Sequence, residues 1–506
     1  SKSLCELFNK SLASGKLPDE WKLSHIIPIP KKCPNDEVTN YRPISLLSVV
    51  SKVLERCIYN QLIVHVSSQL HHLQFGFLRG KSTTSQLLHV INEINKALEN
   101  REQIDSIYLD FAKAFDKVDH ILLLKKLRNF GITGKLLNWF NNYLSNRLQK
   151  VTVLGSTSQP LPILSGVPQG SILGPLLFLV FVNDLPDSIS RQSSVALFAD
   201  DTKCYRSVTR VSDCEILQSD LHNLVQWCSN WKMDLNLSKC AVSHMSRNRQ
   251  PIHYDYELLG HSIKVVDAQK DLGVVLSSDL KWNKHVDITS SKANRMLGFV
   301  RRVAINIKDF QVHKVLYLSL VRGLFAYASQ VWSPQTVSNI VKIEKVQRRA
   351  TKFILSLPYK TDISYKERLQ TIHILPVCYW QEYLDMVYIY KCLVYKSDEN
   401  ISIKRRGRVT RMNDITNGIL LEIPRSRTVA YKNSFYVRAP SVWNTLPKDL
   451  RDTIRSVSSF KTNLCQFYNK LLDDIFDPED PRTYKTVCIK CHSTRSLLTL
   501  STSSCC

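Results

Sequence analysis

One short stretch constrains this chain more than any other. An apolar run, residues 195–199, ends in two adjacent acids, Asp200 and Asp201, and a mixed run follows. The pattern predicts a buried strand, a tight turn and a return strand, with both carboxylates at the hairpin tip. Paired carboxylates can bind a divalent cation such as Mg²⁺ if a third carboxylate faces them. An Asp-Asp pair alone is usually just a solvated turn, so the site hypothesis depends on a partner elsewhere in the chain.

Length and charge bound the architecture and the partners of the chain. A chain of 506 residues is expected to form roughly two to four domains. Lys and Arg outnumber Asp and Glu by 68 to 44, and the resulting net charge of +24 is spread along the sequence. This excess favours a polyanionic partner, most simply nucleic acid, although a basic protein with a solvated surface has the same composition.

Cysteine usage and apolar segments bear on location. The 14 cysteines lack the spacing of a disulfide framework, which predicts a reducing compartment. The longest apolar run, residues 172–182, is too short to span a membrane. We therefore expect an intracellular protein of the nucleus and cytoplasm, with no membrane partner. Because the chain opens on Ser1 inside a predicted helix, we also expect it to be part of a larger polyprotein.

Two basic loops in the first hundred residues are candidate phosphate-binding segments. Residues 25–32 predict a short strand whose prolines suit a sheet edge, and Lys31 and Arg42 bracket the polar loop that follows. Further on, Arg79 and Lys81 precede a predicted helix, with Ser82 and Thr83 as its expected caps. These cations could hold a triphosphate or a template backbone, although solvated loops have the same pattern. The spacing does not match an NTPase P-loop.

The candidate for the third carboxylate is Asp110. It follows a predicted buried strand, residues 107–109, where a charge is costly unless a cation or a donor neutralises it. The turn after it carries Phe115 and Asp116. We interpret Asp116 and Asp119 as turn or helix-start acids.

A turn rich in glycine and proline lies between these two stretches. It spans Ser165-Gly-Val-Pro-Gln-Gly-Ser-Ile-Leu-Gly-Pro175 and leads into an apolar helix. Gly170 would let the backbone approach a ligand, and the Gln169 amide could bind a base or a sugar. A tight turn into a core helix would have the same pattern. Later, Lys239 follows an amphipathic helix at 216–231, and a further hairpin element is predicted at 270–277.

The remaining chain is predicted to be mainly helical and basic. Residues 404–411 form a basic run and residues 431–447 mix aromatic with basic side chains, which suits nucleic acid but also a solvated face or a compact core. Cys488 and Cys491 provide at most half of a zinc site.

The order of the motifs carries a resemblance to a known family. The palm motifs of reverse transcriptases closely resemble Leu109-Asp-Phe-Ala-Lys-Ala-Phe-Asp116, Ser165 to Pro175, and Phe198-Ala-Asp-Asp201. Finger and later palm motifs of the non-LTR retrotransposon branch resemble Tyr41-Arg-Pro-Ile-Ser-Leu-Leu47, Gln74-Phe-Gly-Phe77, Leu237-Ser-Lys239 and Leu272-Gly273. The best match is the jockey-like group, over about residues 17–280.

The resemblance implies an α+β fold of the right-hand polymerase type. It places fingers with an N-terminal extension at 1–103, a palm with an antiparallel sheet at 104–282, a helical thumb at 283–360 and a mainly α region of uncertain role at 361–506. An endonuclease domain or another element-encoded protein is expected outside this chain.

The resemblance also assigns roles. Two Mg²⁺ ions, with Mn²⁺ as the alternative, would be held by Asp110, Asp200 and Asp201. Of these, Asp201 is the least secure, because neighbouring strand side chains point to opposite faces. Phe115 would be a steric gate against the ribose 2′-hydroxyl, and Lys239 would donate a proton to pyrophosphate. The dNTP and template contacts would come from Gln169, Gly170, Lys31, Arg42, Arg79 and Lys81.

The implied activity is RNA-directed DNA polymerisation, with an RNA template, a DNA primer or target, and dNTPs. An intron-maturase-like enzyme is one rival, but it would be expected to carry a splicing domain. The other rival is an element-derived nucleic-acid-binding protein that no longer polymerises. The intact Asp110, Asp200 and Asp201 argue against decay of the site.

Overall fold

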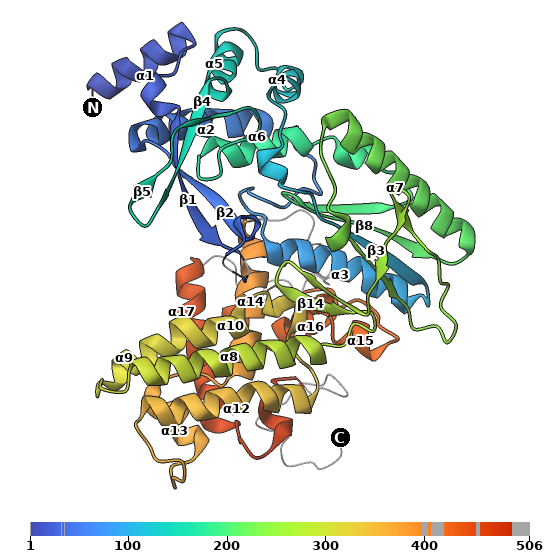
Figure 1. Cartoon of the computed structure of the whole chain (residues 1–506). Helices are drawn as coiled ribbons and strands as arrows, with labels where there is room; N and C mark the ends of the chain where they lie inside the picture. Colours follow the sequence, from blue (N-terminus) through green and yellow to red (C-terminus); the bar gives the residue numbers. More distant parts are fainter. Residues whose placement is uncertain are drawn as a thin grey trace. The chain divides into compact units, whose positions relative to one another are not determined.

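The computed structural model describes residues 2–31, 33–34, 36–395, 403–405, 419–451 and 456–487 (Figure 1). The chain divides into two compact units. Unit 1 comprises residues 1–79, 105–242 and 252–266, and unit 2 comprises residues 80–104, 243–251 and 267–506. The predicted half zinc site at Cys488 and Cys491 lies outside the described residues. The four-part division into fingers, palm, thumb and C-terminal region stays a prediction.

Most of the sheet that carries the candidate site belongs to unit 1. Its strand order is β12-β9-β3-β8-β7, so β3 (Gln103–Leu109) is the middle strand, and it is buried along its whole length. β7 (Ser194–Phe198) and β8 (Asp201–Val208) form an antiparallel hairpin, which confirms the hairpin predicted from residues 195–201. At the opposite edge of the sheet the pairing is parallel, between β12 (Lys264–Val265) and β9 (Ala241–Met245).

Helices bury the apolar surface of this sheet. α6 (Leu173–Val182) is almost purely apolar and lies in the core, where it contacts α2 (Val49–Val66) and α4 (His120–Asn129). α7 (Val211–Trp231) runs along β8 (Figure 1). The other helices of unit 1 are α1 (Lys2–Ser14) and α5 (Gly134–Leu144), with short 3-10 turns η1 (Asp19–Trp21), η2 (Val38–Asn40), η3 (Ala114–Asp116), η4 (Leu185–Ser188) and η5 (Leu237–Lys239).

A second sheet of unit 1 corrects one expectation. Its order is β2-β1-β4-β5, with β6 also paired to β4, so β1 (Leu23–Pro30) is not an edge strand. The prolines are still tolerated, because the pairing of β1 with β4 covers only residues 23–26 and stops before Pro28 and Pro30. The bounds are β2 (Tyr41–Leu46), β4 (Arg147–Val153), β5 (Ser156–Thr157) and β6 (Leu161–Ile163), with a separate small ribbon of β10 (Glu257–Leu258) and β11 (His261–Ser262).

Unit 2 is mainly helical. α3 (Thr83–Glu99) begins with the predicted cap, since the Ser82 hydroxyl accepts a hydrogen bond from the Ser85 amide. α8 (Asn283–Val303) packs along α12 (Val337–Ile354), and β13 (Ala268–Asp271) pairs with β14 (Val274–Ser277) as the predicted hairpin. The other helices are α9 (Phe310–Leu316), the π-helical η6 (Tyr317–Arg322), α10 (Gly323–Ala326), α11 (Ser329–Trp332), α13 (Tyr365–Ile372), α14 (Val377–Tyr395), α15 (Val429–Lys432), α16 (Phe435–Thr445) and α17 (Val457–Asp474), with 3-10 turns η7 (Lys448–Leu450) and η8 (Pro481–Tyr484). Among the described residues, no helix is long and apolar enough to cross a membrane.

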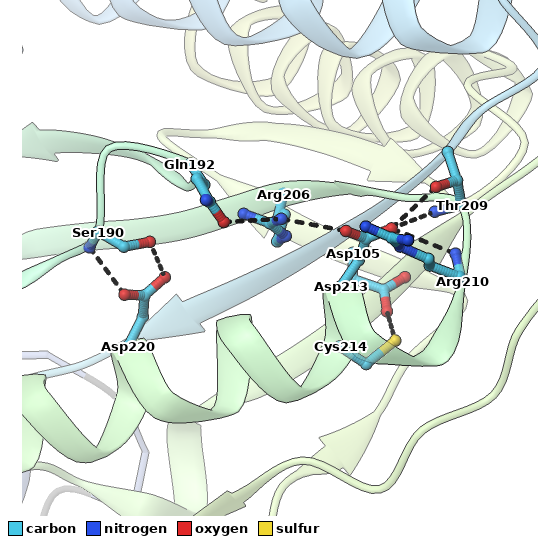
Figure 2. A network of polar contacts seen from close by, with 9 residues as sticks. All are labelled: Asp105, Ser190, Gln192, Arg206, Thr209, Arg210, Asp213, Cys214 and Asp220. Carbon is cyan, nitrogen blue, oxygen red and sulfur yellow. Dashed lines mark hydrogen bonds and ion pairs between the residues drawn. The ribbon is translucent and has the colours of Figure 1, made fainter.

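A polar network fastens α7 to the sheet (Figure 2). Arg206 of β8 donates to Asp213 of α7 over 3.1 Å, and both side chains are nearly buried. Asp213 also accepts from the backbone and hydroxyl of Thr209 at 3.0 and 2.9 Å. Burial would raise the pKa of Asp213, but these donors outweigh it and lower the pKa to about 2. Further along the helix, Asp220 accepts from the Ser190 amide and hydroxyl.

We predict that Asp213→Asn lowers the free energy of unfolding at pH 7 by about 3 kcal/mol, because Arg206 then lies nearly buried without a carboxylate. The folded pKa of Asp213 lies below the unfolded value of about 3.9. Its stabilisation is therefore complete above about pH 4 and is lost as the pH falls towards 2. Urea unfolding at pH 7, 4 and 3 should show the gap between variant and parent narrowing only below pH 4.

The exposed acid Asp187 provides the control, since Asp187→Asn should change the unfolding free energy by less than about 0.5 kcal/mol at each pH. A gap between Asp213→Asn and the parent that stays constant down to pH 3 would contradict the assignment.

Candidate active site

The structure brings two of the predicted carboxylates together. Asp110 directly follows the middle strand β3, and Asp200 lies in the two-residue turn between β7 and β8, where Phe198 pairs with Asp201. Burial is the main cause that raises the pKa of Asp200, and the negative charge of Asp110 raises it further. Like charges interact this way only when they are close. Asp110 and Asp200 therefore lie close to each other.

Two of the predicted cations act on the same carboxylate. The positive charges of Lys31 and Arg42 lower the pKa of Asp200 and oppose the effect of Asp110. The backbone explains their common position, because the Lys31 amide donates to the Asn40 carbonyl over 2.7 Å at the end of β1 where β2 begins. Arg42 follows on β2. Lys31 and Arg42, the two cations that bracket the loop, therefore both lie near Asp200.

Lys239 pairs directly with Asp110. Its Nζ donates to Asp110 Oδ2 over 2.7 Å, and both side chains remain partly exposed. The loop before Lys239 is tied to the segment after β3, since the Asn236 amide donates to the Asp110 carbonyl over 2.7 Å and the Ala112 amide donates to the Asp234 carbonyl over 2.8 Å. These backbone bonds place a residue far along the sequence beside the carboxylate.

Phe115 lies in an aromatic stack close to these acids in sequence. Its ring stacks on Phe178 of α6, with centroids 4.3 Å apart and planes 15° apart. Phe77 meets the Phe115 ring edge to face at 6.2 Å. Aromatic pairs in these geometries typically contribute about 0.5–1.5 kcal/mol beyond their buried area. The Phe115 ring is therefore held in position from two sides.

Gln169 and Gly170 connect two other segments of unit 1. The Gln169 amide Nε2 donates to Asp116 Oδ1 over 3.0 Å, so this side chain is oriented by the residue next to Phe115. Burial raises the pKa of Asp116, while the hydrogen bond from Gln169 lowers it in part. Gly170 has a φ of +122°, and a Cβ there would lie 2.4 Å from the Ser45 carbonyl of β2. Gly170 therefore permits a close approach of protein backbone, where the sequence had suggested a ligand.

The comparison with known proteins decides the family. Residues 29–300, more than half of the chain, match the family described as "Reverse transcriptase (RNA-dependent DNA polymerase)". This chain belongs to the reverse transcriptase family. The predicted mixed α and β fold is confirmed, and membership is consistent with a right-hand polymerase.

Curated relatives confirm the resemblance to non-LTR elements. The chain is 30% identical over 370 residues to the "Probable RNA-directed DNA polymerase from transposon BS" of Drosophila melanogaster, covering 70% of this chain and 41% of the relative. It is 32% identical over 369 residues to the "RNA-directed DNA polymerase from mobile element jockey" of the same organism, covering 70% and 40%. The chain thus matches about two-fifths of the length of these relatives.

A solved structure of apo telomerase from Candida Tropicalis aligns with a TM-score of 0.42 at 10% identity, over 79% of this chain and 72% of that chain.

Reverse transcriptase domains generally use divalent metal ions, and the carboxylate pair fits such an ion. Mg²⁺ is commonly held by one or two carboxylates together with substrate phosphates and water. Asp110 and Asp200 provide two oxygen donors whose mutual repulsion a cation would relieve. Within the described ranges, no group of three or more His, Cys, Asp or Glu side chains gathers as a metal site. Asp201 begins β8 and is exposed, and its place as third ligand stays a prediction.

The roles of Arg79 and Lys81 as contacts to the dNTP and the template stay predictions as well. Arg79 is exposed at the end of the first segment of unit 1, and Lys81 belongs to unit 2. Asp119 is a helix-start acid as interpreted, because its side chain accepts from the Leu122 amide at the start of α4.

Sequence reasoning gave no role to Gln74, yet this residue supports the turn that carries Asp200. The buried Gln74 Oε1 accepts from the Ala199 amide over 3.0 Å and from the Gly76 amide over 2.8 Å. The Phe75 amide donates to the Leu197 carbonyl over 2.8 Å, so Gln74 forms an isolated parallel β-bridge with Leu197 of β7. The motif Gln74-Phe-Gly-Phe77 therefore contacts both the Asp200 turn and, through Phe77, the Phe115 ring.

The close packing around Gly76 explains why the motif Gln74-Phe-Gly-Phe77 has a glycine at this position. A Cβ at this position would lie 2.5 Å from the Ala199 amide nitrogen, which is backbone and cannot turn away. Ala199 itself has a φ of +57°, so the turn is already in the left-handed region. The signal in the sequence was a glycine between two aromatic residues, but nothing in the sequence identifies β7 as the segment that approaches it.

We predict that Gly76→Ala destabilises unit 1 by about 1–3 kcal/mol, because the turn at Ala199 must shift to accommodate the methyl group. Gly323→Ala is the matched control, since nothing lies within 4 Å of a Cβ there and the residue begins α10. The control should be neutral or stabilise by up to about 1 kcal/mol. Chemical denaturation of the three proteins measures both effects, and equal behaviour of the two variants would contradict the close approach.

Proposed function

We propose that this chain is an RNA-directed DNA polymerase of a jockey-like non-LTR retrotransposon. It would extend the 3′ end of a DNA primer or target with dNTPs on an RNA template. The observation that supports this most strongly is the shared site of Asp110 and Asp200, surrounded by Lys31, Arg42 and Lys239, in a chain of the reverse transcriptase family. Fingers, palm and thumb would occupy 1–103, 104–282 and 283–360.

In this proposal the acids bind metal ions and the cations bind phosphates. Asp110 and Asp200, with Asp201 as the proposed third ligand, would hold Mg²⁺ or Mn²⁺. Bound there, the metal would lower the pKa of the primer 3′-hydroxyl and neutralise charge on the triphosphate. Lys31 and Arg42, which already act on Asp200, would bind the triphosphate. The Arg79 and Lys81 side chains would add contacts to triphosphate or template.

Lys239 has a defined position for proton transfer in this proposal. Its ammonium lies 2.7 Å from Asp110 Oδ2, so it neutralises the carboxylate and carries a proton beside the site. A partly exposed ammonium can donate that proton to the pyrophosphate that leaves. To do so, Lys239 would exchange its partner from the carboxylate to the phosphate.

Phe115, Gln169 and Gly170 would shape the nucleotide site. The stack of Phe115 on Phe178 would keep the ring against the sugar C2′ position, where it would exclude a 2′-hydroxyl. Gln169, oriented by Asp116, would contact the template or the incoming base with its remaining hydrogen-bonding groups. An endonuclease partner and a location in the nucleus and cytoplasm remain part of the proposal.

We predict that Asp200→Ala abolishes primer extension on a poly(rA)/oligo(dT) duplex with Mg²⁺. Metal-assisted charge stabilisation of several kcal/mol corresponds to about 10³-fold or more in rate. Asp187→Ala, which removes an exposed acid, should extend primers at the parental rate. Chelation should stop the parent and added Mg²⁺ or Mn²⁺ should restore it. If the parent binds the duplex but neither protein extends it, the chain is an element-derived nucleic-acid-binding protein.

We predict that Phe115→Val relaxes sugar selection. The smaller side chain should admit a ribose, because steric overlap in a packed site typically costs about 1–3 kcal/mol, or about 10- to 100-fold. The measurement is the ratio of kcat/KM for dTTP and UTP in single-nucleotide extension. Phe299→Val, at an exposed aromatic position on α8, is the control and should keep the parental ratio. An unchanged ratio in Phe115→Val would overturn the assignment of the gate.

A further inference from the structure

Unit 2 contains a large basic hollow whose lining shares no residue with the proposed polymerase site in unit 1. Its volume is about 1230 Å³, and it lies where the end of α8, the second half of α12, the segment before α13 and the end of α17 come together. The basic side chains that line it are Arg301, Lys345, Arg348, Arg349, Lys352, Lys366 and Arg368. The acids are Asp362, Asp474, Asp477 and Glu479. We name this site the α12 hollow.

The spacing of the cations on α12 concentrates them on one face. Lys345, Arg349 and Lys352 follow one another at intervals of four and three residues, which places them on the same side of a helix. Arg348 lies between them and is already paired, because its guanidinium contacts Glu479 over 3.0 Å. Three exposed cations, Arg301, Lys345 and Arg349, have no acidic partner within ion-pair distance among the residues that the structure describes. Their charge is therefore available to an anion.

An exposed aromatic ring lies in the same hollow. The residue Tyr359 is 87% exposed, in the segment between α12 and α13. The Lys352 Nζ lies 5.1 Å from the centroid of this ring, so the ring is flanked by positive charge. Basic residues next to an exposed ring are the combination that binds unpaired bases together with their phosphates.

We propose that the α12 hollow binds a single-stranded segment of nucleic acid, with phosphates on Arg301, Lys345 and Arg349 and one base stacked on Tyr359. A duplex fits these features less well, because its bases are already stacked and only its backbone could meet the cations. This binding site is additional to the proposed polymerase site in unit 1 and needs no catalytic turnover. The RNA template outside the primer duplex is a single strand of the required chemistry.

The first test removes charge from the hollow. The triple variant Arg301→Gln, Lys345→Gln, Arg349→Gln is compared with the control Lys308→Gln, Lys461→Gln, Lys470→Gln, which removes the same charge from exposed positions that do not line the hollow. Fluorescence anisotropy measures binding of an unstructured 15-nucleotide RNA over a series of salt concentrations. Three lost phosphate contacts should reduce the slope of log K against log salt by about 2. An unchanged slope, or an equal reduction in the control, would overturn the proposal.

The second test examines the stacking ring. Tyr359→Ala should weaken binding of the single strand by about tenfold, whereas Tyr359→Phe, which keeps the ring, should bind as the parent does. The same oligonucleotide is also presented as DNA and as a duplex. A loss on RNA and DNA single strands alike supports a site for any single strand, and a loss confined to RNA supports a template site. A loss on the duplex as large as on the single strand would overturn the assignment to unpaired nucleic acid.

Discussion

The proximity of Asp110 and Asp200 is the constraint on which the rest of the proposed site depends. Two carboxylates at short range repel each other, and burial of Asp200 adds to the cost of its charge. The fold compensates with cations from three separate segments, because Lys31, Arg42 and Lys239 act on one or the other acid. This arrangement keeps a concentrated negative charge inside a basic surrounding, which suits a site that must bind both a metal ion and a polyphosphate.

The positions of Asp110 and Asp200 are set by backbone hydrogen bonds more than by side-chain contacts. β3 is the buried middle strand, so the position of Asp110 is fixed by hydrogen bonding to neighbours on both sides. Asp200 lies in a turn, where local stability is usually lower. The Gln74 side chain compensates by accepting a hydrogen bond from the Ala199 amide, and the backbone on either side of Gln74 hydrogen-bonds to Leu197. The turn is therefore built into the sheet on one side and fastened by a buried amide on the other.

Local patterns in the sequence predicted the elements that carry Asp110 and Asp200. The apolar run before Asp200 predicted the hairpin, the strand before Asp110 was predicted at residues 107–109, and Ser82 was predicted as a helix cap. Each of these depends on interactions within a few residues or on simple periodicity. The sequence analysis could therefore name the two acids without knowing how far apart they lie.

The errors and omissions all concern contacts between distant segments. Prolines suggested that β1 is an edge strand, but the fold pairs β1 on both sides and ends the β4 pairing before Pro28. Nothing local shows that Gln74 will meet Ala199, or that Gly170 will meet Ser45. Such pairings are properties of the assembled sheet, and a single sequence contains no signal for them.

These distant contacts make the motifs depend on one another physically. Phe77 touches Phe115, Gln169 binds Asp116, and Gly170 lies against β2, the strand that carries Arg42. A change in one motif therefore moves its neighbours, since the glycine contacts leave no space for adjustment. Residues in contact of this kind are expected to show non-additive effects when they are changed together. The residues proposed as the gate, the nucleotide contacts and the metal ligands are therefore best understood as one packed unit, whose geometry is set by a few close backbone approaches.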